Sequence, residues 1–359
     1  MIPQPASICR SLLLLPGLCA AAALAQAPAS APQLRSPWDV HPIAVTSKGY
    51  TCATPQVLPK DIVAYDFYSD AKHSVIDPAR YAAYNAAAKL FEDAEHATES
   101  AADNFQATGS RAAADCVFQI LLANAQAGAM TGNMASNQSN YVQNWTLGAL
   151  AVTWLKVRSA QPGSAADRKA IADWLDTVGG QVHGYFAERH AKSTTDSQNN
   201  HYYWAGFAAM ASAIAADDKP LFAWGVSTYD DGIGCILPDG TLPLEMARGQ
   251  RALHYHLFAM TPLVIMAELG TVNGLDLYTR DNNALTRLIF RCMAGLADNK
   301  YFTSKAGIAQ DTPEKGKIKS EDVVALVPYL RRYPNSDLSR LLQSVNLKPY
   351  NYIGGMPPP

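Results

Sequence analysis

A long succession of helix-forming segments dominates this sequence and points to a helical fold. From about Pro78 onward, apolar residues recur at helical spacing in segments rich in alanine, such as RAAADCVFQILLANAQAGAM. We expect about nine or ten helices between that point and the C-terminus. Strand signals are scarce, and the Asp-Gly turn in LPDGTLP, residues 237–243, predicts a small hairpin or a loop.

The connections between these segments indicate how the helices are arranged. Helices of roughly 12–25 residues joined by short polar turns favour antiparallel neighbours. No strict sequence repeat is present, so an incomplete ring of antiparallel helical hairpins with a cleft at one end fits better than an armadillo-type array. The sequence therefore predicts an all-α fold with residues 49–359 as one domain. The pattern alone leaves the ring arrangement open.

The first residues have the features of an export signal. Arg10 supplies a positive charge, Ser11–Leu24 form an apolar stretch, and residues 23–27 contain small-x-small cleavage sites. We therefore expect residues 1–27 to be a secretory signal peptide and residues 28–48 to be a loose leader. The apolar stretch is too short for a membrane span, so no membrane anchor is expected.

Charge and cysteine content argue against several classes of protein. The formal net charge is -2, and no basic stripe indicates a nucleic-acid partner. Neither C-x-x-C nor H-E-x-x-H occurs, so no metal site and no cofactor are expected. An exported protein can form disulfides, but spacing does not choose among the possible pairings. The cysteines beyond the predicted signal peptide are Cys52, Cys116, Cys235 and Cys292.

The stretch SQNNHYYWAG, residues 197–206, places amide, imidazole and aromatic groups at the start of a predicted helix. On a helix, Trp204 shares a face with both Asn200 and His201. This combination suits an active site that uses an amide, an imidazole and a flat ring side by side. The alternative is an asparagine N-cap followed by a core histidine, and these residues alone do not decide between the two.

A second cluster lies in EMARGQRALHYHLFAM, residues 245–260. Arg248, Arg251 and Tyr255 fall on one face of a predicted helix, and His254 adjoins the tyrosine. Arginine binds carboxylates in a bidentate manner, and a tyrosine beside a cation can act as an acid or a base. The alternative is a solvated basic face that leads into a buried helix.

A third cluster, NQSNYVQNW at residues 137–145, combines amides with aromatic rings. Gln138 and Tyr141 are of the kinds that line sugar subsites, because a pyranose has an apolar face and a polar rim. The alternative is a capping turn followed by a core tryptophan, Trp145.

Together, NNHYYW and RGQRALHY resemble the joint motif of the alginate lyases of polysaccharide lyase family 5. NWTLGALAVTWLKV and PLFAWGVSTYDDGIGCILPDGTLPLE are also similar to family segments, so the resemblance covers residues from about 50 to 355. It implies an (α/α) toroid and β-elimination on polyuronic acids, usually poly-β-D-mannuronate. It also implies a periplasmic enzyme with an anionic polysaccharide as its partner, and nothing in the sequence demands more than a monomer.

The resemblance also implies roles for individual residues. Asn200 and Arg248 would face the substrate carboxylate, His201 and Tyr255 would carry out the proton transfers, and Trp204 would line the cleft. Further substrate contacts are expected from residues near these positions: Tyr68, Lys72, Gln138, Tyr141, Arg251 and His254. Cys52 and Cys116 are similar to a family disulfide pair.

Departures from the family pattern bear on specificity. In the lid segment AYDFYSDAKHS, Tyr68 matches, but the family lysine falls on Phe67, with Lys72 a few residues on. The basic residue before NNH is replaced by Ser197 and Gln198. Strict mannuronate specificity is therefore one expectation, and a broader lyase that also accepts glucuronan or hyaluronan is the other.

Two other classes of protein remain as alternatives. A non-catalytic periplasmic polyuronate-binding protein would keep the arginines and the aromatic rings without needing a tyrosine hydroxyl. A helical-toroid glycoside hydrolase would use two carboxylates. The candidates for that pair are Glu245, Asp196, Asp230 and Asp231. The presence of both the Asn-His and the Arg-Tyr motifs favours a lyase over both alternatives.

Overall fold

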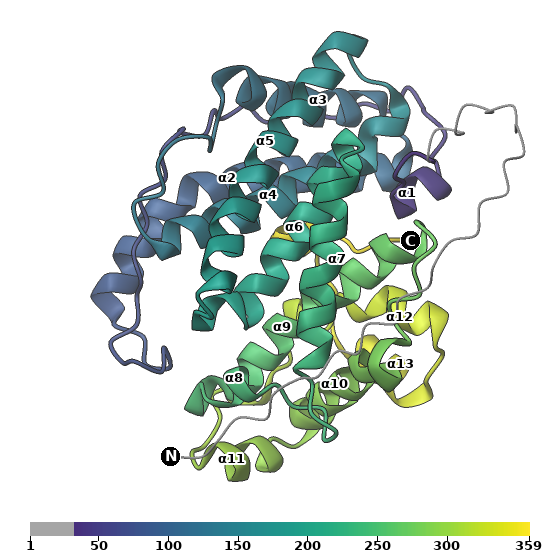
Figure 1. Ribbon diagram of the computed structural model, residues 1–359. Helices are drawn as coiled ribbons and strands as arrows, with labels where there is room; N and C mark the ends of the chain where they lie inside the picture. Colours follow the sequence, from purple (N-terminus) through teal and green to yellow (C-terminus); the bar gives the residue numbers. More distant parts are fainter. Residues whose placement is uncertain (1–31) are drawn as a thin grey trace, which may run out of the picture. The chain divides into compact units, whose positions relative to one another are not determined.

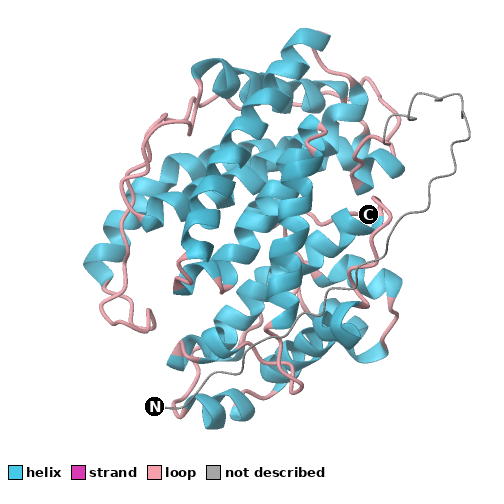
Figure 2. Ribbon diagram, in the orientation of Figure 1, coloured by secondary structure: helices cyan, strands magenta, loops and turns pink. Residues whose placement is uncertain are grey.

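The computed structural model describes residues 32–359, and one compact unit within it spans Leu34–Pro359. The predicted signal peptide and the first residues of the predicted leader lie outside the described residues. Over the described range the chain forms helices, turns and isolated β-bridges but no strand, so the all-α prediction is confirmed (Figure 2).

The helices vary from single turns to long rods. The α-helices are α1 (Pro37–Val40), α2 (Pro78–Thr108), α3 (Arg111–Ala127), α4 (Asn137–Val157), α5 (Ala165–Ala191), α6 (Asn200–Ala216), α7 (Lys219–Gly234), α8 (Pro243–Met246), α9 (Ala252–Thr271), α10 (Arg280–Ala297), α11 (Lys300–Ala306), α12 (Leu326–Arg332) and α13 (Ser336–Ser344). The short 3-10 helices are η1 (Arg158–Ala160), η2 (Thr195–Ser197), η3 (Gly249–Arg251), η4 (Glu314–Gly316), η5 (Ser320–Asp322) and η6 (Asn351–Ile353).

Local sequence signals explain where the longest helices begin and end. The Asp77 side chain accepts hydrogen bonds from two backbone N–H groups in the first turn of α2, as an N-cap does. That helix ends at Gly109, whose φ of 73° is in the left-handed region that glycine adopts without strain. Ser110 follows at once as the N-cap of α3, so the two helices form a tight hairpin.

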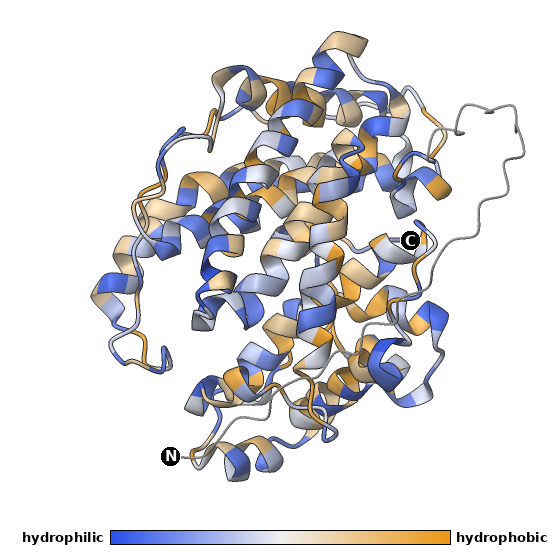
Figure 3. Cartoon of the chain, in the orientation of Figure 1, coloured by the Kyte–Doolittle hydropathy of each residue, from blue (hydrophilic) through white to orange (hydrophobic). Residues whose placement is uncertain are grey.

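The helices are arranged in an inner and an outer layer. Helix α6 lies at the centre, with α4, α5, α7 and α9 packed against it (Figure 1). Helices α4, α6 and α9 are buried on nearly all sides, as their nearly continuous apolar sequences require. The outer helices alternate hydrophilic and hydrophobic residues (Figure 3). In α10, for example, the apolar side chains of Leu285, Leu288 and Cys292 share the buried face.

The segment Gly249–Thr271, which contains α9, is long and apolar enough to cross a membrane by length and composition alone. In the fold, 89% of the most apolar 18-residue stretch of this segment is buried within the protein. A core helix of a large α-helical domain has the same composition.

The prediction of a loose leader up to residue 48 is wrong from Leu34 onward. Leu34 and Trp38 are buried in the core, and Asp39 forms an ion pair with Arg158. Farther along, the backbone of Thr46 exchanges hydrogen bonds with Gly109 and Arg111 at 2.8 and 3.0 Å. This proline-rich segment supplies a leucine and a tryptophan to the core, which its composition alone does not indicate.

The N-terminal segment between α1 and α2 is tied to the helices along its length. A disulfide joins Cys52 to Cys116 of α3, whereas Cys235 and Cys292 are free thiols. The LPDGTLP segment is a closed turn rather than a hairpin, because Leu237 N–H donates to the Thr241 carbonyl at 2.9 Å and no strand flanks it.

Candidate active site

The first turn of α6 presents its polar side chains in two different ways. Asn199 is the N-cap, and its side-chain oxygen accepts from the backbone N–H of His201 at 3.0 Å. Asn200 is therefore free of the capping role and is completely buried. His201 is partly exposed, and its ring stacks on Tyr141 of α4 with 3.8 Å between centroids.

The environment of His201 favours an uncharged imidazole. Burial, followed by the positive charge of Arg248, lowers the pKa of His201 to about 3. Its Nδ1 atom is buried and has no hydrogen-bond partner in the described part of the chain. At neutral pH this ring is therefore uncharged, and one of its nitrogens can accept a hydrogen bond.

The Asn200 amide is held by a carboxylate that the sequence did not mark as part of this site. Glu245 of α8 accepts from the Asn200 backbone N–H at 2.7 Å and from Nδ2 at 3.0 Å. The Asn200 Oδ1 atom is buried and unpartnered among the described residues. The signal that could have indicated this contact is the carboxylate three residues before Arg248.

The start of α9 brings two guanidinium groups over one tyrosine ring. The Cζ atoms of Arg248 and Arg251 lie 3.5 and 5.4 Å from the ring centroid of Tyr255. The expectation that these three residues lie on one face of a helix is wrong, because α9 begins only at Ala252. Arg248 converges on the tyrosine through a turn in which Gly249 adopts a φ of 56°.

A loop before α2 covers the tyrosine. The hydroxyl groups of Tyr68 and Tyr255 are in hydrogen-bond contact, and Arg251 Nη1 donates to the Tyr68 hydroxyl at 3.0 Å. Arg248 Nη2 donates to the His73 carbonyl of the same loop at 2.8 Å. The predicted lid residue Tyr68 is thus in the site, 6% exposed and in direct contact with the α9 residues.

Aromatic rings connect the α6 cluster with the α9 cluster. Trp145 lies 6.0 Å from His201 and 5.9 Å from Phe258, centroid to centroid, and Phe258 lies 6.3 Å from Tyr255. The sequence motifs 137–145, 197–206 and 245–260 therefore meet at one place. Gln138 also lies at the start of α4, with its Nε2 atom buried and unpartnered among the described residues.

Two predicted site residues need comment. Trp204 does not line a cleft: it is 0% exposed and packs against Phe207 and Phe258, so it is a core residue. Because nearly all of α6 is buried, the helical face that Trp204 shares with Asn200 points into the protein. His254 is partly exposed beside Tyr255, with 5.0 Å between the ring centroids, and burial holds its pKa well below the usual value.

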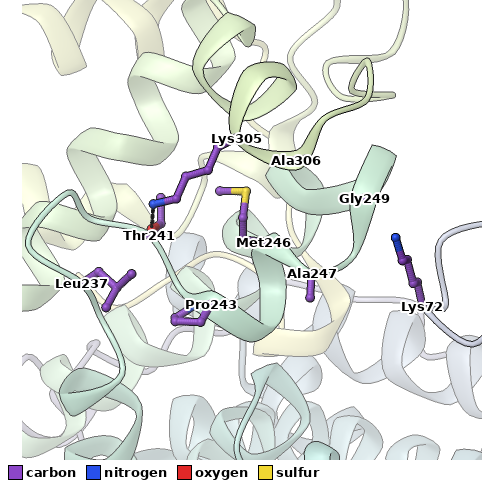
Figure 4. Close-up of a pocket in the computed structure, with 9 residues that line it drawn as sticks. All are labelled: Lys72, Leu237, Thr241, Pro243, Met246, Ala247, Gly249, Lys305 and Ala306. Carbon is purple, nitrogen blue, oxygen red and sulfur yellow. Dashed lines mark hydrogen bonds between the residues drawn. The ribbon is translucent and has the colours of Figure 1, made fainter.

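A pocket of about 400 Å³ adjoins the Arg248 turn (Figure 4). Met246, Ala247 and Gly249 form its wall on one side, and Lys72 extends toward it from the covering loop. Lys72 is exposed, and no ion pair engages its ammonium group among the described residues. Lys72 therefore places a cation at the edge of a pocket that is also lined by Ala247 and Gly249, the two neighbours of Arg248 in the chain. Within the same described range, no group of three or more His, Cys, Asp or Glu side chains is arranged to hold a metal ion.

Comparison with known proteins places this geometry in a family. The family model described as "Alginate lyase" matches residues 61–302. A protein named polysaccharide lyase from Stenotrophomonas maltophilia is 37% identical over 271 residues, which cover 75% of this chain and 80% of the relative. The chain belongs to the alginate lyase family.

Other members of the alginate lyase family agree over more of the chain. An alginate lyase from Pseudomonas paraeruginosa is 30% identical over 329 residues, covering 89% of this chain and 88% of the relative. The crystal structure of alginate lyase A1-III from Sphingomonas species A1 superposes with a TM-score of 0.71 at 26% identity, covering 87% of each chain. A histidine-to-alanine variant of alginate lyase A1-III complexed with tetrasaccharide superposes with a TM-score of 0.73 at 25% identity, covering 87% of this chain and 86% of that one.

These likenesses confirm two predictions made from the sequence. The fold is an (α/α) toroid of the alginate lyase type, and the protein is a polysaccharide lyase. The hydrolase alternative is therefore excluded by family membership. The carboxylates considered for it have other partners: Glu245 binds Asn200, and Asp196 accepts from Tyr141 and from Arg189, both at 2.7 Å.

Proposed function

We propose that this alginate lyase family member cleaves polyuronic acids, with poly-β-D-mannuronate as the principal substrate, by β-elimination that leaves a 4,5-unsaturated uronate end. The observation that carries the proposal is the convergence of Arg248, Arg251 and the Tyr255 hydroxyl with the neutral imidazole of His201. These groups provide what the reaction needs: positive charge for a carboxylate and two groups that transfer protons. The relatives named alginate lyase support alginate as the substrate.

Charge stabilisation is the first requirement of this reaction. Removing the C5 proton of a uronate moves negative charge onto its carboxylate, so fixed donors aimed at that carboxylate lower the barrier. We assign this role to Arg248 and Asn200. Arg248 is 9% exposed, so its charge acts where little water screens it.

The proton transfers follow from the stereochemistry of the sugar. In mannuronate the C5 proton and the C4 leaving oxygen lie on the same side of the ring, so Tyr255 can take the first proton and deliver one to the oxygen. In a glucuronate unit they lie on opposite faces, so His201 would act as base and Tyr255 as acid. The imidazole is uncharged at pH 7, as the base role requires, and the negative charge of a bound uronate would raise its pKa from about 3 toward the working pH.

Breadth of specificity is part of the proposal. The covering loop carries Phe67 where the family pattern has lysine, and Lys72 instead reaches the pocket beside Gly249. A single flexible ammonium attracts a neighbouring uronate carboxylate without imposing one geometry. This arrangement supports activity on glucuronan or hyaluronan in addition to mannuronate.

The proposed place of action is the periplasm, with the protein acting as a monomer without a membrane anchor. Residues 1–27 have the composition of a signal peptide. The Cys52–Cys116 disulfide supports an oxidising compartment.

The decisive experiment follows ultraviolet absorbance during incubation with separate pools of poly-mannuronate, poly-guluronate, poly-glucuronate and hyaluronan. The new C4=C5 double bond absorbs, so a rise reports β-elimination directly. We expect the fastest rise on poly-mannuronate and slower rises on poly-glucuronate and hyaluronan. Binding without any rise would overturn the proposal and favour a non-catalytic polyuronate-binding protein.

A further inference from the structure

The last residues of the chain are fixed against the inner helices. Asn351–Ile353 form η6, which packs against α2 and α4. The backbones of Tyr350 and Gly355 exchange hydrogen bonds at 3.0 and 3.2 Å, so this part of the chain is a closed turn. Lys156 of α4, which is 0% exposed, donates to the Gly354 carbonyl at 2.5 Å. The C-terminal segment is therefore an integral part of the core.

One carboxylate of α2 ties this segment to α4. The Asn351 Nδ2 group donates to Glu95 Oε2 at 2.6 Å, and the Thr146 hydroxyl donates to Glu95 Oε1 at 2.6 Å. Glu95 is 2% exposed, so these bonds form where little water competes for them. The two residues that Glu95 holds are the chain neighbours of Tyr352 and Trp145. The bridge thus fixes the backbone on which each of these two aromatic rings is carried.

The rings of Tyr352 and Trp145 are stacked, with 5.3 Å between the centroids and 16° between the planes. On another side, Trp145 lies 6.0 Å from the imidazole of His201, and Phe258 meets it edge-on at 5.9 Å. A buried indole N–H usually has a hydrogen-bond partner, but Nε1 of Trp145 has none within residues 32–359. The orientation of the indole therefore depends on the rings packed against it.

We propose that Tyr352 is a positioning residue for the lyase reaction: its ring fixes Trp145, and Trp145 fixes one side of the His201 imidazole. The inference rests on the proposed function, in which His201 takes part in proton transfer. Tyr352 lies beyond residues 61–302, the part of the chain that the alginate lyase family model matches. The C-terminal segment thus supports the site from outside that region.

Two substitutions at Tyr352 test the role of its ring. Tyr352→Ala removes the ring, so the indole can turn into the vacated space and release the imidazole. We expect kcat on poly-glucuronate, where His201 would be the base, to fall by about tenfold, with KM within about threefold of wild type. On poly-mannuronate, where Tyr255 would carry both transfers, the fall should be smaller. Tyr352→Phe keeps the ring and should retain kcat within about threefold of wild type on both polymers.

A second readout needs no substrate. Carbon–proton NMR of the histidine Cε1 groups follows protonation of His201, and His201→Gln assigns its signal. Because burial lowers the pKa of His201 to about 3, its signal should stay fixed between pH 8 and pH 5 in wild type. In Tyr352→Ala water reaches the imidazole, so we expect its pKa to rise by about one to two pH units and its signal to move near pH 5. The charges that act most strongly on this ring are unchanged in the variant: Arg248, Asp196, His73 and Asp66.

The matched control is Tyr333→Ala beside α12. Tyr333 is 37% exposed, and its ring packs against those of Tyr278 and Tyr329 at 5.5 and 5.2 Å, away from His201. This variant measures what the loss of a partly exposed aromatic contact does to folding alone. We expect it to keep wild-type kcat and an unchanged His201 titration. If Tyr352→Ala does not unfold cooperatively, Tyr352→Leu, which fills more of the space but cannot stack, replaces it with the same expectations.

The outcomes separate the positioning role from the proposed function. An unchanged His201 titration in Tyr352→Ala, an equal fall of kcat on both polymers, or a Tyr352→Phe enzyme as impaired as Tyr352→Ala would overturn the inference. Wild-type enzyme that produces no absorbance change on any polyuronate would instead refute the lyase proposal. The titration would then still decide whether Tyr352 controls the surroundings of His201, and it alone decides this if wild type cleaves only poly-mannuronate.

Discussion

The imidazole of His201 lies face to face with the phenol ring of Tyr141, with 3.8 Å between the centroids and 15° between the planes. The Tyr141 hydroxyl donates to Asp196 at 2.7 Å, and Arg189 Nε donates to the same carboxylate at 2.7 Å. The ring that supports the imidazole is therefore fixed from its far end. From the sequence, Asp196 was a candidate only for the hydrolase alternative and not a residue of the predicted lyase site.

This contact predicts graded effects of two substitutions at Tyr141. Tyr141→Phe keeps the stacked ring and loses the bond to Asp196, whereas Tyr141→Leu loses both. We expect kcat to fall severalfold in the first variant and by about tenfold to a hundredfold in the second. Without the stacked ring, the imidazole would be displaced from the position in which it can react with the substrate. Steady-state kinetics on poly-glucuronate would show this most clearly, and equal activities of the two variants would contradict the positioning of His201 by the stack.

Removal of the Tyr255 hydroxyl is expected to abolish most turnover. Tyr255→Phe retains the ring beneath Arg248 and removes only the proton-transferring group, so we expect kcat to fall by about 10²–10⁴-fold with little change in substrate binding. Tyr278→Phe is a suitable control, because Tyr278 is a buried tyrosine whose hydroxyl contacts Glu268 outside the site. Near wild-type turnover by Tyr255→Phe would show that another group transfers the protons.

Lys72 is expected to affect substrate affinity rather than chemistry. It is an exposed cation at the edge of the pocket near Gly249, so Lys72→Ala should raise KM for the polymer several-fold and leave kcat unchanged. The difference should shrink in high salt, because exposed charges are screened. Lys60→Ala removes an exposed lysine that lies beside Gly128 instead and should leave KM unchanged. A fall in kcat for Lys72→Ala would assign this lysine a more direct role.

The buried His256 predicts how stability depends on pH. It is 0% exposed, its Nε2 accepts from Leu242 N–H at 2.9 Å, and burial lowers its pKa to about 4. Below pH 6.5 the unfolded chain binds a proton at His256, whereas the native protein does not until the pH approaches 4. Protonation of His256 in the unfolded chain therefore lowers the free energy of unfolding as the pH falls from 6.5 toward 4, by on the order of 3 kcal/mol. His256→Gln cannot titrate, so its unfolding free energy should change less than that of wild type between pH 7 and pH 4.5. Denaturant titrations of both proteins measure the difference, and parallel pH profiles would contradict the assignment.

The disulfide between Cys52 and Cys116 is expected to stabilise the fold without contributing to catalysis. It closes a loop across 64 positions of sequence and anchors the N-terminal segment to α3. Replacing both cysteines by serine should reduce the free energy of unfolding by about 2–4 kcal/mol and leave kcat at a permissive temperature unchanged. Thermal unfolding and thiol titration check this: the denatured, unreduced chain from Leu34 onward should expose two free thiols, Cys235 and Cys292. Four reactive thiols in that chain would contradict the pairing.

Some features of the fold and of the site could be predicted from the sequence, and others could not, for physical reasons. The helix that begins at Asn200 was predictable because capping and hydrophobic periodicity are local properties. The complete burial of Trp204 was not predictable, because a helical face is buried or exposed according to what packs against it. Here other helices pack against α6. The same limit applies to Arg248, which reaches Tyr255 through a turn at Gly249 rather than along a helix.

The all-α class of this protein and the three motifs from which its site is built were predictable from the order of its residues. Those properties depend on residue type and on spacing over a few positions. The contact of Glu245 with Asn200, and that of Tyr68 with Tyr255, a residue 187 positions away, are seen only in the folded protein. Contacts between distant segments depend on how the helices pack, and no local pattern in the chain specifies that packing.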